Sequence, residues 1–394
     1  MSVPILIATL MRPEGDTGVQ THFRAFMEFL VERGEVAEVV TPFSSPAWQV
    51  YPVFGVRKLV DRMNKVASVW WYRHWHRKFL ELALRRRLAG GQPCVIYAQC
   101  PPSAHAALAA RVSPQQRVVM VTHFNVSQAD EWAGKGAIAE GGSYFRIIRQ
   151  FEARVLPQLD GLVFVSEFMR RELLARIPDI ADVPYEVVPN FIRLPAETTG
   201  SEEFDADLIT IGTLEARKNQ RYALEVVAAA KQLGRRITLT LVGDGPDRER
   251  LLVLARDLGV AGEVRFAGYV PQAAALLSRH HACLHVANIE NLPLTLIEAL
   301  SRGLPVFAPA VGGVPEVFKN SVEGRFIPLD NAKDAAQMII EWLDSPVAIE
   351  RAGEAARARF IDRFEAGKVA ARLQAFLTSA STIWFTSDAH PGRT

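Results

Sequence analysis

The segment at residues 285–316, HVANIENLPLTLIEALSRGLPVFAPAVGGVPE, predicts a strand, a loop, a helix, a second strand and a glycine turn. Residues 282–286 are a short apolar run of the kind found in buried strands. Pro293 suits the first turn of the following helix, where its missing N–H would have no partner. Residues 304–308 form a second apolar run, and a Gly-Gly pair then opens another helix. This order is typical of a parallel sheet covered by helices.

Two carboxylates accompany this unit. Glu290 lies in the predicted loop at the carboxyl end of a strand, and Glu298 lies about a turn and a half into the next helix. Ligands bind at that edge of an open parallel sheet. Carboxylates accept hydrogen bonds from sugar hydroxyls, and the N–H groups of Gly312, Gly313 and Val314 at a helix start can hold phosphate oxygens. The spacing fits such a ligand, and it fits equally a solvated loop acid and an ordinary acid on a helix surface.

Two further loops are expected at the same edge. Gly212 turns the chain after a strand, and Arg217 and Lys218 follow on the loop. Two adjacent cations suit a diphosphate, because arginine binds phosphate oxygens in pairs and lysine acts as a point charge. Gly243 and Asp244 end the next strand in the same way and are expected to border a nucleotide.

The pattern E-x₇-E at 290–298, followed by SRGLPV at 301–306 and VGGVPE at 311–316, resembles the signature of the family 4 retaining glycosyltransferases of the GT-B fold. The likeness extends upstream through GTLEARKN and LVGDGP, at 212–219 and 241–246, and so covers the C-terminal half. The N-terminal half matches more weakly, through EGDTG at 14–18 and VPN at 188–190. The family usually has two adjacent glycines where this chain has Thr17 and Gly18.

The resemblance implies an α/β chain with two Rossmann-like, doubly wound domains that face each other across a cleft. It implies transfer of a sugar from a nucleotide diphosphate sugar, UDP- or GDP-linked, to an acceptor hydroxyl with retention of configuration. In this family the hydroxyl attacks from the side on which the phosphate departs, and the phosphate takes the proton, so no protein nucleophile is expected. The expected catalytic residues are Glu290 at the sugar, His123 near the reacting centre, and Arg217 and Lys218 at the diphosphate. The expected donor-binding residues are Gly18, Gly212, Gly243, Asp244, Leu292, Glu298 (at the ribose), Gly312 and Gly313.

Length and composition fit two globular domains. The 394 residues are 49% apolar and 22% charged. The net charge is only +2, so the chain as a whole lacks the excess of positive charge that is typical of nucleic-acid-binding proteins. The cysteines Cys94, Cys100 and Cys283 are too few and too scattered for a disulfide framework or a zinc site, which favours a reducing cytoplasm. The first residues, MSVPILIATL, have no basic leader, and no run of 18 apolar residues occurs, so we expect neither a signal peptide nor a membrane-spanning segment.

The pattern of apolar runs predicts the domain boundaries. We expect an N-terminal acceptor-binding domain at 1–193, a polar linker at 194–205 and a C-terminal nucleotide-sugar domain at 206–364. A last helix at about 365–385 is expected to cross back onto the first domain, before a disordered tail at 386–394. Predicted strands lie at 3–9, 36–41, 93–98, 117–122, 161–165, 185–189, 207–211, 237–242, 263–266, 282–286, 304–308 and 324–328. Predicted helices lie at 19–33, 219–233, 246–258, 271–280, 293–302 and 332–344, and from 347 to about 381.

Residues 57–88 form a basic, aromatic segment compatible with a helix. Ten lysines and arginines face two acids, a local charge of +8 against −6 for the rest of the chain. Such a segment indicates a membrane-surface element, with Trp70, Trp71, Trp75, Arg85, Arg86 and Arg87 as the contacting residues. The alternative is a solvated helix pair that packs its tryptophans inside the domain.

No metal or cofactor is expected. The triplet Asp205-Ala206-Asp207 precedes a strand, away from any ligand edge, and is predicted to be solvated. The histidines His280, His281 and His285 are predicted to be core or surface residues. The sequence favours a glycosyltransferase acting on a lipid-linked glycan in polysaccharide assembly, peripheral on the inner face of the cell membrane. Alternatives are a nucleotide-sugar epimerase on a similar scaffold and a glycosyltransferase with a soluble acceptor.

Overall fold

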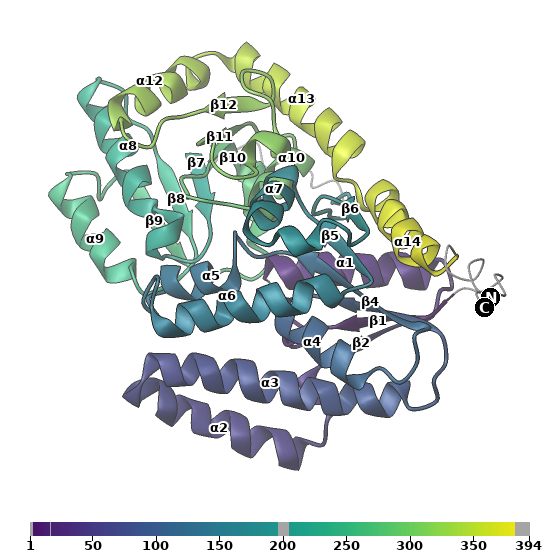
Figure 1. Cartoon of the computed structure of the whole chain (residues 1–394). Coiled ribbons are helices and arrows are strands. Elements are labelled where there is room, and N and C mark those ends of the chain that lie inside the picture. Colours follow the sequence, from purple (N-terminus) through teal and green to yellow (C-terminus); the bar gives the residue numbers. More distant parts are fainter. Residues whose placement is uncertain (1–2, 16, 196–204, 383–394) are drawn as a thin grey trace. The chain divides into compact units, whose positions relative to one another are not determined.

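The computed structural model of the protein describes residues 3–15, 17–195 and 205–382 (Figure 1). The chain divides into two compact units. The first contains the described residues up to Pro189 and the helix that begins at Ala366, and the second runs from Asn190 to Glu365. The expected linker lies mostly, and the expected tail entirely, outside the described residues. None of the described helices is long and apolar enough to cross a membrane.

The first unit is built on a parallel sheet of six strands in the order β2-β1-β3-β4-β5-β6. The four inner strands are mainly apolar and buried, because helices cover both faces of the sheet, whereas the two edge strands are more exposed. Their bounds are β1 Ile5–Ala8, β2 Ala37–Val40, β3 Cys94–Ala98, β4 Gln116–Thr122, β5 Gly161–Phe164 and β6 Tyr185–Val187. Ile5 pairs with both Ala37 and Val95, so the strand order reverses beside β1, between β1 and β3.

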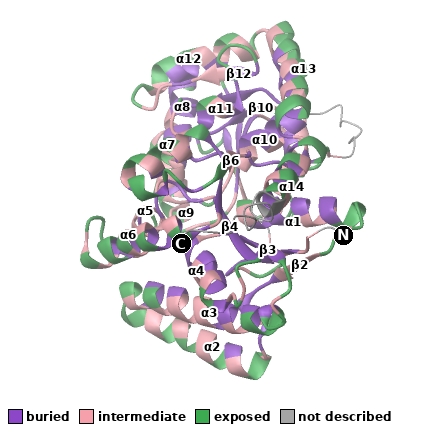
Figure 2. Cartoon of the chain, turned by 45° about the vertical axis from the view of Figure 1, so that its right-hand side comes forward, coloured by how far each residue is buried: buried purple, intermediate pink, exposed green. Residues whose placement is uncertain are grey.

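The helices of the first unit follow the strands as crossover connections. They are α1 Gly18–Glu32, α2 Ala47–Met63, α3 Lys65–Leu88, α4 Pro101–Ala110, α5 Gln128–Gly134, α6 Ser143–Val155, α7 Glu167–Arg176 and α14 Ala366–Thr382, with short 3₁₀ turns η1 Pro42–Ser44, η2 Leu156–Gln158 and η3 Pro178–Ile180. Thr17 and Gln20 form a capping box that starts α1. The helix α14 packs against α1 and β3, and Arg372 on it pairs with Glu186 of β6. In Figure 2 the strands are mainly buried, whereas α2 carries many exposed residues.

The second unit repeats the architecture with the order β12-β11-β10-β7-β8-β9, all strands parallel. Its strands are β7 Ala206–Ile211, β8 Leu239–Val242, β9 Val264–Gly268, β10 His280–Leu284, β11 Val306–Ala308 and β12 Gly324–Phe326. Its helices are α8 Gln220–Gln232, α9 Arg248–Asp257, α10 Leu294–Ser301, α11 Val314–Val317, α12 Ala332–Leu343 and α13 Pro346–Arg363, with 3₁₀ segments η4 Ala216–Lys218 and η5 Ala273–Arg279. The prediction of two Rossmann-like units is confirmed.

Four predicted elements differ from the structure. The helix expected at 271–280 is a 3₁₀ segment that ends at Arg279, and the strand expected at 282–286 begins earlier, at His280. The basic segment at 57–88 is not one element, because α2 begins at Ala47 and Asn64 interrupts the helical path. The Asn64 side chain accepts a hydrogen bond from the Ala67 N–H (3.0 Å) and so starts α3 as a separate helix. The final helical stretch is likewise divided, between α13 and α14.

Candidate functional site

The strand order of the second unit places its ligand edge at β7 and β10. The sheet order reverses between these neighbours, with β8 and β9 on one side and β11 and β12 on the other. Ligands of open α/β sheets bind outside the carboxyl ends of the strands at such a switch point. Gly212 directly follows β7, and His285 directly follows β10. The loops that carry the predicted site residues of the C-terminal half therefore begin at the expected edge of the sheet.

The loops after β7 and β8 approach each other through their backbones. Gly243 has a φ of +137°, and a Cβ at this position would overlap the carbonyl group of Gly212. The carbonyl oxygen of Asp244 accepts a hydrogen bond from the Leu214 N–H (3.0 Å). These contacts fix the start of the segment that carries Arg217 and Lys218, and the aliphatic part of Lys218 extends past Gly212.

Glu290 is the centre of a buried charge cluster. Its carboxylate forms a direct ion pair with Lys218, and it lies 3.5 Å from an Arg217 nitrogen and 3.5 Å from Nε2 of His285. The Glu290 side chain is 8% exposed. Burial acts to raise the pKa of Glu290, but Lys218, His285 and Arg217 outweigh it and hold that pKa well below the usual range. The carboxylate is therefore ionised at every physiological pH.

His285 belongs to the site, although the sequence favoured a core or surface role. Burial lowers the pKa of His285, so the imidazole beside Glu290 is neutral at neutral pH. The predicted strand at 282–286 contained His285, and a lone histidine carries no pattern, so only the structure places it directly after β10 at the ligand edge. Asn190, quoted from the sequence only as part of the VPN motif, was given no role at the site: its side-chain NH₂ donates to the Leu292 carbonyl (2.8 Å) and so supports the loop between Glu290 and α10. Leu292 itself is buried.

The Gly312–Gly313 turn holds the backbone of Glu290. Gly312 has a φ of +55°, and a Cβ there would overlap the Glu290 carbonyl oxygen. That oxygen accepts a hydrogen bond from the Gly313 N–H (2.9 Å), and the Val314 N–H donates to Val311 (3.0 Å). Phosphate was predicted to be held by the N–H groups of Gly312, Gly313 and Val314, and this needs correction for Gly313 and Val314, because both already have backbone partners. The contacts show that the two glycines shape the support beneath Glu290.

Glu298 lies on α10 in a different electrostatic environment. Burial raises the pKa of Glu298 to about 7, and Arg302 opposes this only in part. Arg217 and Lys218 are not among the groups that shift it. The two predicted glutamates thus differ in chemistry, since Glu290 is held ionised by cations and Glu298 titrates near neutrality.

A second cluster of polar side chains lies in the first unit, at the switch point of its own sheet. The ring centroids of His123 and His22 lie 4.6 Å apart in an edge-to-face arrangement, and Nε2 of His123 lies 3.3 Å from Oε1 of Gln99. His22 is fully buried on α1, and its Nε2 lies 3.1 Å from the Tyr97 hydroxyl. Gly18 is the first residue of α1. The strand ends β1, β3 and β4 thus bring His123 and the start of α1 to one edge.

Two family models match the chain in succession. The model described as Glycosyltransferase Family 4 matches residues 17–194, and the model described as Glycosyl transferases group 1 matches residues 196–359. The chain belongs to the family 4 glycosyltransferases.

Similar proteins agree with this assignment. A glycogen synthase of Mycobacterium tuberculosis is 26% identical over 295 residues, which cover 73% of this glycosyltransferase and 69% of that protein. A GDP-mannose-dependent alpha-(1-6)-phosphatidylinositol monomannoside mannosyltransferase of M. tuberculosis is 26% identical over 385 residues, 89% of this chain and 92% of that one. The structure of HepE from Anabaena in complex with UDP and glucose matches with a TM-score of 0.67 and 15% identity, covering 96% of this chain and 100% of HepE.

The predicted membrane residues of this glycosyltransferase fall into different environments. Trp70 is 47% exposed, whereas Trp71 and Trp75 are half-buried. The Trp71 Nε1–H donates to the Val53 carbonyl (2.9 Å) on α2. The prediction that all three tryptophans meet a membrane therefore needs correction: Trp71 packs against α2, as the alternative proposed, and half-buried Trp75 contacts the Trp71 and Phe79 rings on its own helix.

The three arginines at the end of α3 are exposed. Arg85 pairs with Glu81 (2.8 Å), and Arg87 pairs with Glu38 (2.6 Å). Their charges are therefore partly balanced within the protein.

The Asp205-Ala206-Asp207 triplet is not solvated as predicted. Asp205 pairs with Arg279 (2.5 Å) and Arg265 (3.3 Å), and Asp207 accepts hydrogen bonds from the N–H and hydroxyl of Thr238 (both 2.7 Å). These contacts fix the amino end of β7. Within the described residues, no group of three or more His, Cys, Asp or Glu side chains is arranged to hold a metal ion.

Proposed function

We propose that this chain transfers a sugar from a nucleotide diphosphate sugar to a hydroxyl of a lipid-linked glycan, with retention and without a metal. One observation carries the donor part of this proposal. Lys218, Arg217 and Glu290 meet at the switch point of the second unit, where two cations and one carboxylate match a diphosphate joined to a sugar.

The charges in this cluster suit departure of a phosphate. As the bond between the anomeric carbon and the phosphate oxygen breaks, negative charge grows on the leaving group. Lys218 and Arg217 stabilise that charge from positions already fixed by Glu290. The acceptor hydroxyl forms the new bond to carbon on the same face, and its proton goes to the departing phosphate. Glu290 holds sugar hydroxyls and Glu298 the ribose, so no protein nucleophile takes part.

An exposed apolar face on α2 supports a membrane-bound acceptor. Trp48, Tyr51, Leu59 and Met63 recur at helical spacing, and Trp48 and Met63 are 75% and 86% exposed. The bases Lys58, Arg62 and Lys65 are exposed around the same helix end. An apolar stripe flanked by bases suits the interface of an anionic bilayer. The surface proposed for membrane contact is therefore centred on α2, with Trp70 and the exposed arginines of α3 beside it.

Relatives leave the donor open between two nucleotides. The mannosyltransferase relative is by its name GDP-mannose-dependent and acts on a phosphatidylinositol mannoside, and HepE was solved with UDP and glucose. We place the reaction in the assembly of a polysaccharide or glycolipid, on the inner face of the cell membrane.

A panel of UDP- and GDP-sugars tests the proposal. Each donor is incubated with the full chain, with and without lipid-linked acceptors extracted from a bacterial membrane, and with EDTA present throughout. Transfer with an axial product linkage from an axial donor supports it. Epimerised nucleotide sugar, or transfer to soluble alcohols alone, would favour the alternatives of an epimerase or a soluble acceptor.

A further inference from the structure

A groove of about 240 Å³ lies in the first unit, between α3, α4 and α6. In Figures 1 and 2, α4 lies near both α3 and α6, and it contacts both helices. Neither α3 nor α6 contributes to the switch point described above, and none of the predicted donor residues lines the groove. It is a separate feature of the molecule.

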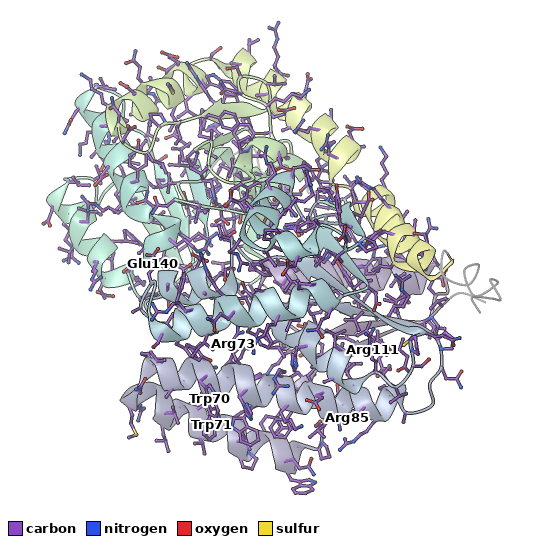
Figure 3. All side chains as sticks on the ribbon, in the orientation of Figure 1. Trp70, Trp71, Arg73, Arg85, Arg111 and Glu140 are labelled. Carbon is purple, nitrogen blue, oxygen red and sulfur yellow. The ribbon has the colours of Figure 1, made fainter. Side chains whose placement is uncertain are left out.

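Cations dominate the walls of this groove. Its ionisable lining residues are Arg73, Arg77 and Arg154 with His74 and His105, besides one tyrosine, and no acid is among them. Arg73 is buried, lies between α3 and α6 (Figure 3) and donates to Oε1 of Gln128 (2.5 Å). Burying a guanidinium beside two others costs free energy unless an anion balances it.

The protein balances these charges only in part. Arg77 lies 3.4 Å from Glu81, but the same carboxylate also pairs with Lys78 and Arg85, so three cations share one acid. Among the described residues, no carboxylate lies within ion-pair distance of Arg154, which is exposed on α6. Glu152, next to the lining residue Phe151, is fully buried and paired with Arg176 (2.8 Å), so its attraction for Arg73 is shared with a second arginine. The groove therefore keeps a positive excess.

Aromatic and aliphatic side chains form the rest of the lining. The rings of Trp70 and His74 stack with centroids 4.9 Å apart, and the Arg73 guanidinium lies 5.4 Å from the centre of the Phe151 ring. Tyr144 and Ile147 extend the same wall on α6. The groove thus offers flat apolar surfaces for a ring or a carbon chain, next to guanidinium groups that can donate paired hydrogen bonds to an anion.

We propose that this groove binds a phosphate ester through Arg73, Arg77 and Arg154, with the organic part of the ester against Trp70 and Tyr144. Guanidinium groups match phosphate oxygens in pairs, and three of them suit the double charge of a phosphomonoester better than a single carboxylate. The volume is below that of drug-sized sites, which fits a headgroup-sized ligand. The phosphate can belong to a lipid headgroup, since Trp70 also lies in the exposed region beside α2, or to a free ester.

The test compares two substitutions in the groove with one outside it. Arg154→Gln and Arg77→Gln each remove one guanidinium group from the groove. Arg146→Gln removes the same charge from an exposed position on α6 that does not line the groove. Arg154→Gln and Arg146→Gln are surface changes, so folding is expected to be retained. Binding of sn-glycerol 3-phosphate and of D-glycerate to the full chain is measured by calorimetry without any nucleotide sugar. Co-sedimentation with vesicles containing phosphatidic acid, or phosphatidylglycerol at equal surface charge, provides the lipid arm.

We expect Arg154→Gln and Arg77→Gln each to weaken phosphate-ester binding on the order of tenfold, the typical effect of losing a charge-assisted hydrogen bond, while Arg146→Gln leaves it unchanged. A loss seen with glycerol 3-phosphate identifies a free ester as sufficient, and a loss confined to phosphatidic-acid vesicles identifies the lipid headgroup. Equal losses in all three variants, equal binding of glycerate, or no binding in either arm would overturn the proposal. None of these outcomes depends on sugar transfer, so failure here and failure of the proposed function are distinguishable.

Discussion

Lys218 and Glu290 form a direct ion pair that links the segment after β7 to the loop after β10. The two side chains are 19% and 8% exposed, so water screens their attraction weakly. Glu290 therefore fixes the position of Lys218, and the diphosphate that we propose to bind here would compete for the same ammonium group. The pair connects the group assigned to the sugar with the group assigned to the leaving phosphate.

Removing Lys218 tests its role at the diphosphate. We expect Lys218→Ala to lower the rate of transfer on the order of a hundredfold, because one preorganised positive charge is lost from the transition state. The buried Glu290 keeps Arg217 and His285 as neighbours, so the fold is expected to survive with reduced stability. Lys333→Ala, an exposed lysine change on α12, is the control. Near-normal transfer by Lys218→Ala would refute the assignment.

The two glutamates are expected to separate binding from chemistry. Glu290→Gln keeps the shape of the side chain but removes the charge near the sugar, so transfer falls strongly while free nucleotide binds almost as before. Glu298→Gln weakens binding of the free nucleotide, because the ribose loses its acceptor. Calorimetry with the nucleotide and a transfer assay with the sugar donor measure the two effects. Weaker nucleotide binding in Glu290→Gln than in Glu298→Gln would reverse the roles.

Glu298 also predicts a pH dependence of stability. Burial raises its pKa from 4.5 to about 7, so between these values the folded protein keeps a proton that the unfolded chain has lost. The free energy of unfolding contributed by this group therefore falls as the pH rises through that window. Urea denaturation measures the difference in the free energy of unfolding between the wild type and Glu298→Gln. This difference should decline by about 1–3 kcal/mol from pH 4.5 to 7.5, which is below the linkage maximum because the side chain keeps some solvent contact.

The control for this pH effect is Glu249→Gln, which changes a side chain that is 83% exposed. Its difference from wild type is expected to stay constant over the same pH range. A constant difference for Glu298→Gln as well would show that Glu298 has an ordinary pKa in the folded protein.

Most of the fold and much of the site could be predicted, because buried strands and glycine turns are determined by residues that are neighbours in the sequence. The strands after which Gly212, Gly243 and Glu290 follow are set by continuous buried runs, and parallel sheets place such ends at one edge. The packing of α2 could not be predicted in this way. A segment rich in Arg and Trp fits both a membrane face and a helix pair, and only contacts such as Trp71 with Val53 decide between them.

The contacts of Glu290 likewise could not be predicted from the sequence. Spacing placed Glu290, Arg217 and Lys218 at one edge, but not the ion pair between them, because it depends on side-chain directions from two loops 72 residues apart. His285 was missed for a related reason. A lone histidine after a strand carries no pattern, and its role becomes visible only from its 3.5 Å approach to Glu290.

Metal removal tests the source of charge at the leaving group. With Arg217 and Lys218 at the diphosphate, we expect EDTA to leave most of the transfer activity intact. The assay is run after dialysis against EDTA and again after addition of magnesium or manganese. Activity that vanishes in EDTA and returns with either ion would show that a metal supplies the charge that we assign to these two residues.

The exposed face of α2 predicts reversible binding to anionic membranes. Trp48, Leu59 and Met63 each leave most of their surface in water, and burial of such a side chain in a bilayer contributes about 1.5–3 kcal/mol. Trp48→Ser combined with Met63→Ser is therefore expected to weaken co-sedimentation with anionic vesicles at least tenfold. Val253→Ser, which changes an exposed apolar residue on α9, is the matched control.

The arginines at the end of α3 should contribute less than this apolar face. Arg85 and Arg87 already pair with Glu81 and Glu38, so replacing residues 85–87 by Ser removes less free positive charge than their number implies. We expect a modest loss of vesicle binding that disappears as salt is added, since screening weakens what remains of the attraction. If the wild-type chain fails to bind anionic vesicles even at low salt, the membrane-bound acceptor is wrong. Transfer to a soluble acceptor would then be the better account of the same donor site.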